Sequence, residues 1–241
     1  MIMESWGPGR RPRVRWQRAG TLGARRSLLR WLPNWLRPGR SRLPGHSSQS
    51  ATWGRRVALR DGSTVLIRQV QPTDAPLLAE GFTRLSAHSR QLRFLRSKDD
   101  LSAAELRYFT DVDHHDHEAL GALDHTDGRG VGIARYIRDA ADPQAAEIAI
   151  TIADDWQGRG LSTELLAQLS ERARSEGIRR FTALVSADND KVIRLLRNAG
   201  GTLVSRGRGT ADYEIMLSPA QEHSLDRWFR CWDDDIVPTQ R

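Results

Sequence analysis

A short glycine turn between a strand and a helix is the part of this 241-residue sequence best suited to chemistry. The turn Gln157-Gly158-Arg159-Gly160 follows an apolar run over 146–153 and precedes an amphipathic segment that begins at Leu161. The first N–H groups of a helix have no intrahelical acceptor and lie at the positive end of the helix dipole. Glycine lets the backbone approach a ligand closely and adopt positive φ. The sequence therefore predicts a site for an anion such as a phosphate at this helix start.

The spacing of the turn indicates which kind of phosphate site it is. No Lys-Ser or Lys-Thr pair follows the second glycine, as a Walker A loop requires, and G-x-G-x-x-G is absent. The turn resembles the pyrophosphate loop of the GNAT N-acetyltransferases, (Gln/Arg)-x-x-Gly-x-(Gly/Ala), with Ser162 replacing its last residue. The resemblance implies acetyl-CoA as the cosubstrate, with its pyrophosphate held by the loop. The residues expected to hold it are Gln157, Gly158, Arg159, Gly160, Leu161, Ser162 and Thr163.

Acetyl transfer to an amine also requires a base. A lysine ammonium has a pKa of about 10.4, so it must lose a proton before it attacks a thioester. Glu147 is the candidate base, since it lies at the start of the strand whose far end becomes the glycine turn. Protein-lysine acetyltransferases that this chain resembles carry a glutamate at the matching point, ten residues before the loop Gln. The alternative is a solvated glutamate at a strand start, the usual situation of this residue type.

A second resemblance concerns the acceptor. The segment 67–94, IRQVQPTDAPLLAEGFTRLSAHSRQLRF, resembles the opening of the catalytic domain of bacterial protein-lysine acetyltransferases. This resemblance implies a protein lysine as the acceptor. It also implies an acyl-CoA synthetase as a protein partner, as in similar proteins.

Further cofactor contacts are expected on the neighbouring elements. A backbone N–H of Ile152 or Ala153, where the strand splays from its neighbour, is expected to donate to the thioester oxygen. Asn189 matches the Asn that bonds the pantetheine arm in the family, and it is equally suited to be a helix N-cap. Arg197, with Arg194 on the same helix, is expected to reach the 3′-phosphate, although an exposed helical arginine commonly has no such role.

Two positions depart from the family pattern. Leu196 stands where many GNAT enzymes have a tyrosine that protonates the departing thiolate. Because a thiol has a pKa of about 8.5, it leaves readily as a thiolate without a dedicated acid. Gly200-Gly201 replaces the usual Gly-Phe, which removes an aromatic anchor.

A histidine-rich loop invites a metal interpretation. His114, His115 and His117 alternate with aspartates ahead of a strand, but no helical i, i+4 pair or second cluster at fixed spacing accompanies them. A metal site needs ligands held in a set geometry. The sequence therefore predicts no metal, and we expect this loop at the mouth of the acceptor site.

The net charge of +7 hides two parts of opposite sign. Residues 1–60 carry fourteen Arg and one acid, whereas 61–241 carry 23 basic and 29 acidic side chains. We expect 1–56 to be a disordered basic arm, because its Arg, Pro and Gly content cannot build a core. Weak contact with a membrane surface or nucleic acid, through Arg and interspersed Trp, is one alternative. A native start near Val57 is another.

Hydrophobic periodicity predicts one domain over 57–219. Expected strands are 57–59, 64–70, 118–124, 130–137, 146–153, 181–185, 202–206 and 213–217. Expected helices begin at Thr73 or Asp74, at Ser86 and at Ser102, and continue with 161–176, ended by an αL residue at Gly177, and 188–199, capped by Asp188 or Asn189. This order matches the GNAT fold, an α/β (α+β) class with a central mixed sheet flanked by helices. Residues 220–241 are expected to form a helical tail.

Together these patterns indicate an acetyl-CoA-dependent N-acetyltransferase that acts on protein lysines. A cytoplasmic location fits the single Cys231, which excludes internal disulfides. Monomer and homodimer both remain open. Two other functions also stay open, namely acetylation of a small-molecule amine and non-catalytic sensing of acyl-CoA.

Overall fold

The computed structural model describes residues 54–217. Its strands are β1 (Gly54–Ala58), β2 (Thr64–Gln69), β3 (His117–Asp124), β4 (Gly130–Arg138), β5 (Ala145–Ile152), β6 (Arg180–Ser186), β7 (Thr202–Arg206) and β8 (Thr210–Met216). Its helices are α1 (Ala75–Thr83), α2 (Ala87–Phe94), α3 (Ala103–Thr110), α4 (Leu161–Ser175) and α5 (Asp190–Asn198), with 3-10 turns η3 (Pro72–Asp74) and η4 (Asp154–Trp156). The predicted basic arm up to residue 53, the C-terminal tail and Cys231 lie outside the described residues.

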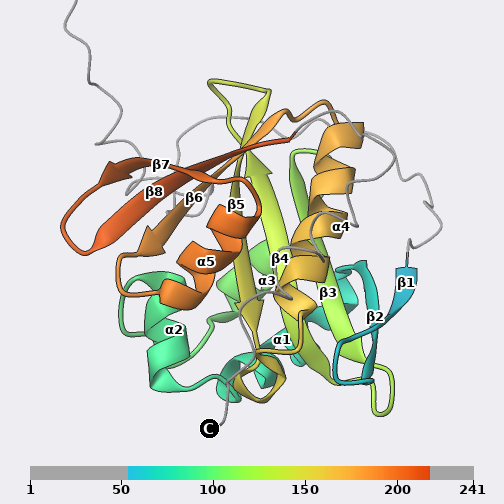
Figure 1. Cartoon of the computed structure of the whole chain (residues 1–241). Helices are drawn as coiled ribbons and strands as arrows, with labels where there is room; N and C mark the ends of the chain where they lie inside the picture. The colour runs from blue at the N-terminus through green and yellow to red at the C-terminus, as the bar shows by residue number, and fades with distance from the viewer. Residues whose placement is uncertain (1–53, 218–241) are drawn as a thin grey trace, which may run out of the picture. The chain divides into compact units, whose positions relative to one another are not determined.

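The strands form one mixed sheet in the order β1-β2-β3-β4-β5-β6-β8-β7. Neighbouring strands are antiparallel except β5 and β6, which are parallel. In Figure 1, α4 and α5 lie in front of the sheet, whereas α1, α2 and α3 lie behind it. The predicted fold class, a mixed sheet flanked by helices, is confirmed.

Most elements occupy their predicted positions, because the apolar pattern alone determines which face is buried. Along β2, Val65 and Ile67 are fully buried, and Leu66 between them is only half-buried. β1 is an exception, because it begins at Gly54 rather than Val57. Arg55 and Arg56 extend the ladder by backbone pairing with β2, which needs no apolar side chain on an exposed edge strand.

Helix α4 makes the largest contribution to the core on the front face. The predicted apolar positions Leu161, Leu165, Leu166 and Leu169 are all at most 1% exposed. The helix ends where expected: Gly177 has φ of 77°, in the left-handed region, and Ile178 N–H donates to Ala173 O at 2.9 Å.

The predicted helix starts agree with the structure. Ser86 and Ser102 cap α2 and α3 as expected, and their Oγ atoms accept from the N–H groups of Ser89 and Glu105. Of the two candidates for the first helix, Asp74 is the N-cap residue of α1, which follows the η3 turn over 72–74. Its carboxylate does not cap α1 but accepts from Gln71 N–H at 2.8 Å.

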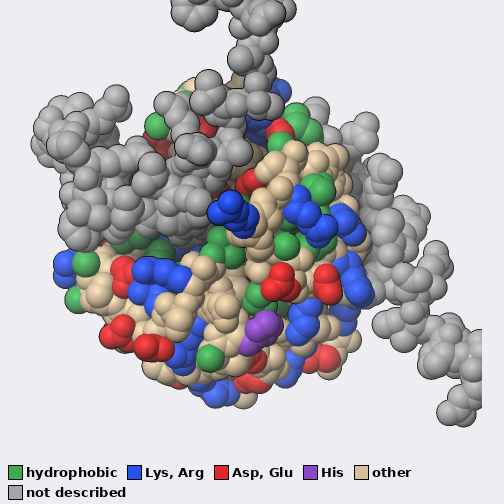
Figure 2. Space-filling view, turned by 90° about the vertical axis from the view of Figure 1, so that its left-hand side faces the viewer, with side chains coloured by type: hydrophobic (Ala, Val, Ile, Leu, Met, Phe, Trp, Pro, Cys, Tyr) green, Lys and Arg blue, Asp and Glu red, His purple; other side chains and the backbone are tan. Residues whose placement is uncertain are grey.

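Surface charge on the described part of the chain is mixed. Acidic and basic side chains lie side by side on the face drawn in Figure 2. Within residues 54–217, no helix combines the length and apolar character needed to cross a bilayer.

A buried carboxylate fastens α4 to the sheet. Glu118 on β3 has no exposed surface, and its oxygens lie 2.7 Å from His114 Nδ1, 3.0 Å from Gln69 Nε2 and 3.1 Å from Arg172 Nε. Burial by itself would raise the pKa of Glu118, but the hydrogen bonds from His114, Gln69 and Arg172 outweigh it and lower the pKa. The carboxylate therefore joins β2, β3 and α4 through charge-assisted hydrogen bonds.

Replacing this carboxylate tests its structural role. Glu118→Ala removes a fully buried carboxylate and leaves the buried Gln69 amide without its acceptor, so we expect the free energy of unfolding to fall by about 3–5 kcal/mol in urea titrations. The control Glu171→Ala, at an exposed position on α4, should change it by less than about 0.5 kcal/mol. Equal stability of the two variants would show that the buried cluster contributes little.

The contribution of the Glu118 carboxylate to the free energy of unfolding should also depend on pH. Because the folded pKa of Glu118 lies below its unfolded value, the stabilisation is complete above the unfolded pKa of about 4.3 and disappears as pH falls through the folded pKa. The stability difference between the native chain and Glu118→Ala should therefore shrink as the pH is lowered from about 6 through the folded pKa of Glu118. A difference that stays constant as pH falls would contradict this assignment.

Candidate active site

Strands β5 and β6 separate shortly after they begin. In the described sheet they pair only from Ala145 opposite Arg180 to Glu147 opposite Thr182. β6 then pairs with β8 along its whole length, and β5 continues to Ile152 alongside β4. Figure 1 shows the two strands diverging. A wedge therefore opens along the second half of β5, on the edge away from β4.

Along the edge of β5 that faces the wedge, every second residue presents its backbone N–H. Ala153 N–H donates to Val131 O at 2.9 Å, so it faces β4. The prediction that Ala153 could donate to a thioester is therefore wrong, because its N–H is already bonded. In an antiparallel ladder successive residues alternate between edges, so the N–H groups of Ile152 and Ile150 face the wedge. Of the two candidates, only Ile152 therefore remains an expected donor.

The loop that follows β5 has the predicted backbone conformation. Gly158 and Gly160 have φ of 80° and 87°, where residues with a Cβ are strained. A Cβ placed on Gly158 would meet nothing within 4 Å, whereas one on Gly160 would lie 3.3 Å from the Arg60 side chain. The loop thus presents bare backbone to open space at Gly158, directly before the N-terminus of α4.

The first turn of α4 fits an anion. Thr163 and Glu164 donate their N–H groups to Gly160 O at 3.1 and 3.2 Å, and the N–H groups of Leu161 and Ser162 precede the first intrahelical acceptor. The Thr163 hydroxyl is buried and has no hydrogen-bond partner among the described residues. A buried hydroxyl beside free helix N–H groups suits the diphosphate of acetyl-CoA, so the residues present fit that cosubstrate.

The Gln157 side chain braces the loop. Its Nε2 donates to Ile152 O at 3.3 Å and to Asp154 Oδ1 at 3.0 Å. Its Oε1 accepts from Lys191 Nζ at 2.8 Å. Gln157 therefore connects the end of β5 to the first turn of α5, and it brings the exposed Lys191, which the sequence reasoning missed, beside the loop.

The Arg159 side chain lies on the β1–β2 turn. Its Nη1 is 3.0 Å from Asp61 Oδ2, and its guanidinium carbon lies 4.5 Å from the centre of the Trp156 ring. Asp61 thus neutralises part of the positive charge expected at the loop. The backbone N–H of Arg159 belongs to the loop, so it stays among the donors predicted to hold the pyrophosphate.

Asp154 ties the loop to the start of α2. Its carboxylate accepts from Ser86 N–H at 2.8 Å and from Ser89 Oγ at 2.5 Å. Burial raises the pKa of Asp154, but the hydrogen bonds from Ser89 and Ser86 outweigh it and lower the pKa overall. Ser86 was predicted as a helix cap, but the sequence contained no signal for its link to Asp154, 68 positions later.

Helix α5 borders the wedge with a mixture of capping and exposed residues. Asn189 is the N-cap, and its Oδ1 accepts from Val192 N–H at 3.2 Å. Arg194 and Arg197 are exposed on this helix. Leu196 is 1% exposed in the core, and a Cβ on Gly201 would lie 2.5 Å from Leu196 O. The close approach of these two backbones explains why glycine replaces the expected aromatic residue.

Glu147 lies at the point where the wedge begins. It pairs with Ile137 of β4 and Thr182 of β6, and its side chain is half-buried. Its charge acts on Arg93 of α2 and on Tyr108 of α3. Burial lowers the pKa of Arg93 to about 10, although Glu147 and Tyr108 act in the opposite direction. The sequence reasoning found Glu147 but neither of these neighbours.

The three histidines before β3 have separate partners. His114 Nδ1 contacts Glu118, His115 Nδ1 contacts Glu176, and His117 Nε2 lies 3.2 Å from Arg135 Nη1. Burial, followed by the charge of Arg135, lowers the pKa of His117 to about 3, so its ring is neutral at physiological pH. Among residues 54–217, no group of three or more potential ligands is arranged to hold a metal.

Comparison with known proteins identifies the family of this chain. The chain matches the family model described as an acetyltransferase (GNAT) domain over residues 64–202. It is 40% identical over 134 residues to acetyltransferase PA5475 of Pseudomonas aeruginosa, which covers 55% of this chain and 72% of that protein. It is 29% identical over 163 residues to acetyltransferase Pat of Mycolicibacterium smegmatis, and there it spans 68% of its own length but 49% of Pat.

A solved structure supports the same relation. The GNAT domain of S. lividans PAT superimposes with a TM-score of 0.64 at 33% identity, and the match covers 68% of this chain and 97% of that domain. The chain therefore belongs to the GNAT family and is an acetyl-CoA-dependent N-acetyltransferase.

Proposed function

We propose that this enzyme transfers the acetyl group of acetyl-CoA to the Nζ of a lysine side chain in a protein. The observation that carries the proposal is the alignment of Glu147, the wedge edge of β5 and the glycine loop along one strand. Similarity to a protein named Pat and to the GNAT domain of S. lividans PAT supports the acceptor class. An acyl-CoA synthetase as the acetylated protein and a cytoplasmic location belong to the same proposal.

Binding is assigned to the loop and to the wedge. The backbone N–H groups of residues 158–162 and the Thr163 hydroxyl hold the diphosphate, because these are the donors at the helix start that the described contacts leave available. Ile152 N–H donates to the thioester oxygen as negative charge develops on it. Acetyl-CoA supplies the thioester carbonyl that the amine attacks.

Proton removal is assigned to Glu147. The acceptor ammonium must become a free amine, and a carboxylate at the start of the wedge can take the proton directly or through one water. Asn189 remains the proposed contact for the pantetheine arm through its amide nitrogen, since its oxygen caps α5. Arg197, exposed on α5, is the proposed contact for the 3′-phosphate.

The Thr163 hydroxyl provides a test of the diphosphate site. Thr163→Val keeps the shape of the side chain but removes one charge-assisted hydrogen bond, which should weaken acetyl-CoA binding at least about tenfold. Calorimetric titration of the full chain measures this. The control Thr126→Val, in the exposed β3–β4 turn, should bind like the native chain. Unchanged affinity of Thr163→Val would place the diphosphate elsewhere.

The role of Glu147 is tested by a substitution that keeps its size. Glu147→Gln should bind acetyl-CoA normally but lower kcat about 100-fold or more at neutral pH, because general bases contribute about 10²–10⁴. The control Glu80→Gln, half-exposed on α1, should retain full turnover. If Glu147→Gln turns over normally, another group removes the proton.

The acceptor class is tested by direct competition. With acetyl-CoA saturating, we expect lysine-containing peptides and folded protein to be acetylated with kcat/KM at least about tenfold above polyamines and free amino acids. Mass spectrometry of the products identifies the modified amine. Preference for a small amine would support the alternative acceptor, and absence of turnover with every amine would support an acyl-CoA sensor.

A further inference from the structure

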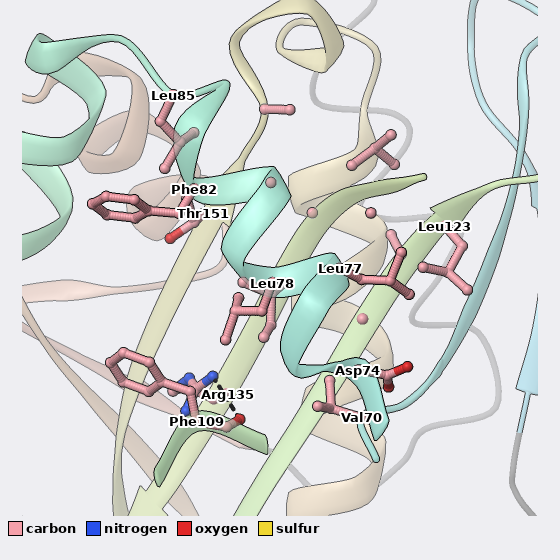
Figure 3. Close-up of a pocket in the computed structure, with 18 of the residues that line it drawn as sticks. Val70, Asp74, Leu77, Leu78, Phe82, Leu85, Phe109, Leu123, Arg135 and Thr151 are labelled. Carbon is pink, nitrogen blue, oxygen red and sulfur yellow. Dashed lines mark hydrogen bonds between the residues drawn. The ribbon is translucent and has the colours of Figure 1, made fainter. Parts of the chain in front are cut away.

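A cavity lies beneath α1, on the face of the sheet that also carries Glu147. Its volume is about 100 Å³. In Figure 3, Leu77, Leu78 and Phe82 of α1 lie over the strands, and Phe109 of α3 lies at one end. On the sheet side the lining reaches Thr151 of β5. The cavity therefore adjoins the strand that borders the wedge.

Most of the cavity wall is apolar. Helix residues form one side, and on the opposite side Gly121 and Gly130 of the strands place no side chain toward α1. The apolar and glycine lining includes Leu77, Leu78, Phe82, Leu85, Phe109 and Gly130. An apolar cavity of about 150 Å³ in another protein binds benzene, so a volume of about 100 Å³ accommodates a chain of about four carbons. Size and lining therefore suit a short hydrocarbon chain.

A buried arginine closes one end of the cavity. Arg135 of β4 is 4% exposed and lies beside Phe109, as Figure 3 shows. Its Nη2 donates to Phe109 O at 3.2 Å, and its Nη1 lies 3.2 Å from His117 Nε2. Among the ion pairs of residues 54–217, none joins Arg135 to a carboxylate. Its positive charge is thus buried against a carbonyl, a neutral imidazole and an aromatic ring.

A second arginine increases the positive charge at this end. Arg93 of α2 also lines the cavity. Burial, together with the charge of Arg93, lowers the pKa of Arg135 to about 9. The negative charge of Glu147 acts on Arg93, so it offsets the positive charge of that one of the two guanidinium groups. At the opposite end, Arg68 and Asp74 neutralise each other through contacts of 2.6 and 2.7 Å. The net charge of the lining is therefore positive and concentrated beside Arg135.

We propose that this cavity binds a carboxylate carried on a short apolar chain, with the carboxylate at Arg135 and Arg93 and the chain beneath α1. A buried guanidinium binds a carboxylate through paired N–H donors, which relieves the repulsion between the two arginines. The chain fills space that the glycines of the sheet leave open. This assignment does not depend on the acceptor proposed above.

Two sources supply such a ligand. One is a free monocarboxylate that binds beside the reaction site. The other is an acyl donor whose acyl chain ends in a carboxylate, since the cavity adjoins the strand proposed to hold the thioester. Both ligands place a carboxylate at Arg135, so the experiment tests the free acid and the acyl donor separately.

The test titrates the full, ¹⁵N-labelled chain with pentanoate and, separately, with pentan-1-ol, and follows the amide signals of Gly121 and Gly132 in the cavity wall. We expect pentanoate to bind at least about tenfold more tightly than the alcohol, because the carboxylate forms charge-assisted hydrogen bonds. Arg135→Met, which keeps the length of the side chain, should remove this preference. Arg208→Met, at an exposed position in the β7–β8 turn, should leave it unchanged.

A second variant leaves both arginines in place. A Cβ on Gly81 of α1 would have only Gly130 O within 4 Å, at 3.7 Å, so Gly81→Leu can extend into the cavity without disturbing the helix. It should weaken pentanoate binding at least about tenfold even if Arg135→Met does not fold. Equal binding of pentanoate and the alcohol, or native affinity in Gly81→Leu, would overturn the proposal.

The last arm distinguishes the sources. Glutaryl-CoA and butyryl-CoA are compared for binding to the native chain and to Arg135→Met. If the acyl donor is the source, glutaryl-CoA binds more tightly in a way that requires Arg135. If both donors bind equally while pentanoate still shifts the wall glycines, the ligand is a free carboxylate. If neither pentanoate nor glutaryl-CoA depends on Arg135, the site does not exist.

Discussion

The pairing of β5 with two different neighbours is the constraint on which the active site depends. β4 stays bonded to β5 along its full length, while β6 leaves after Glu147 because it is committed to β8. A buried strand with unpaired backbone groups is costly unless water or a ligand satisfies them. The separation therefore produces both an opening and a row of backbone groups that a ligand can use, without any dedicated side chain.

The rest of the fold holds this opening in a fixed geometry. Glu118 fastens α4 to the sheet, which fixes the helix N-terminus relative to β5. Asp154 connects the same loop to α2, the helix that places Arg93 near Glu147. A few buried or half-buried polar contacts thus join the glycine loop, the proposed base Glu147 and helix α2. Displacing one of these elements would shift the others.

Sequence reasoning recovered the parts of this arrangement that depend on local signals. The apolar repeat of α4, the glycine turn and Asn189 as a cap each follow from neighbouring residues, so their positions were predictable. The contacts that join distant segments were not. Nothing near Asp154 indicates that it accepts hydrogen bonds from Ser86 and Ser89 at the start of α2, and nothing near Arg135 indicates that its charge lies beside a cavity. Ala153 was misassigned because the edge to which an N–H points depends on ladder register, which a single strand does not reveal.

The central claim is that the N–H groups of Ile150 and Ile152 face the wedge, whereas that of Ala153 is bonded to β4. Amide hydrogen exchange, read residue by residue by NMR with and without acetyl-CoA, tests it most directly. We expect Ala153 to be protected in both states, and Ile150 and Ile152 to exchange rapidly until acetyl-CoA is added. Strong protection of Ile150 and Ile152 in the free protein, or no gain on addition of acetyl-CoA, would contradict the account.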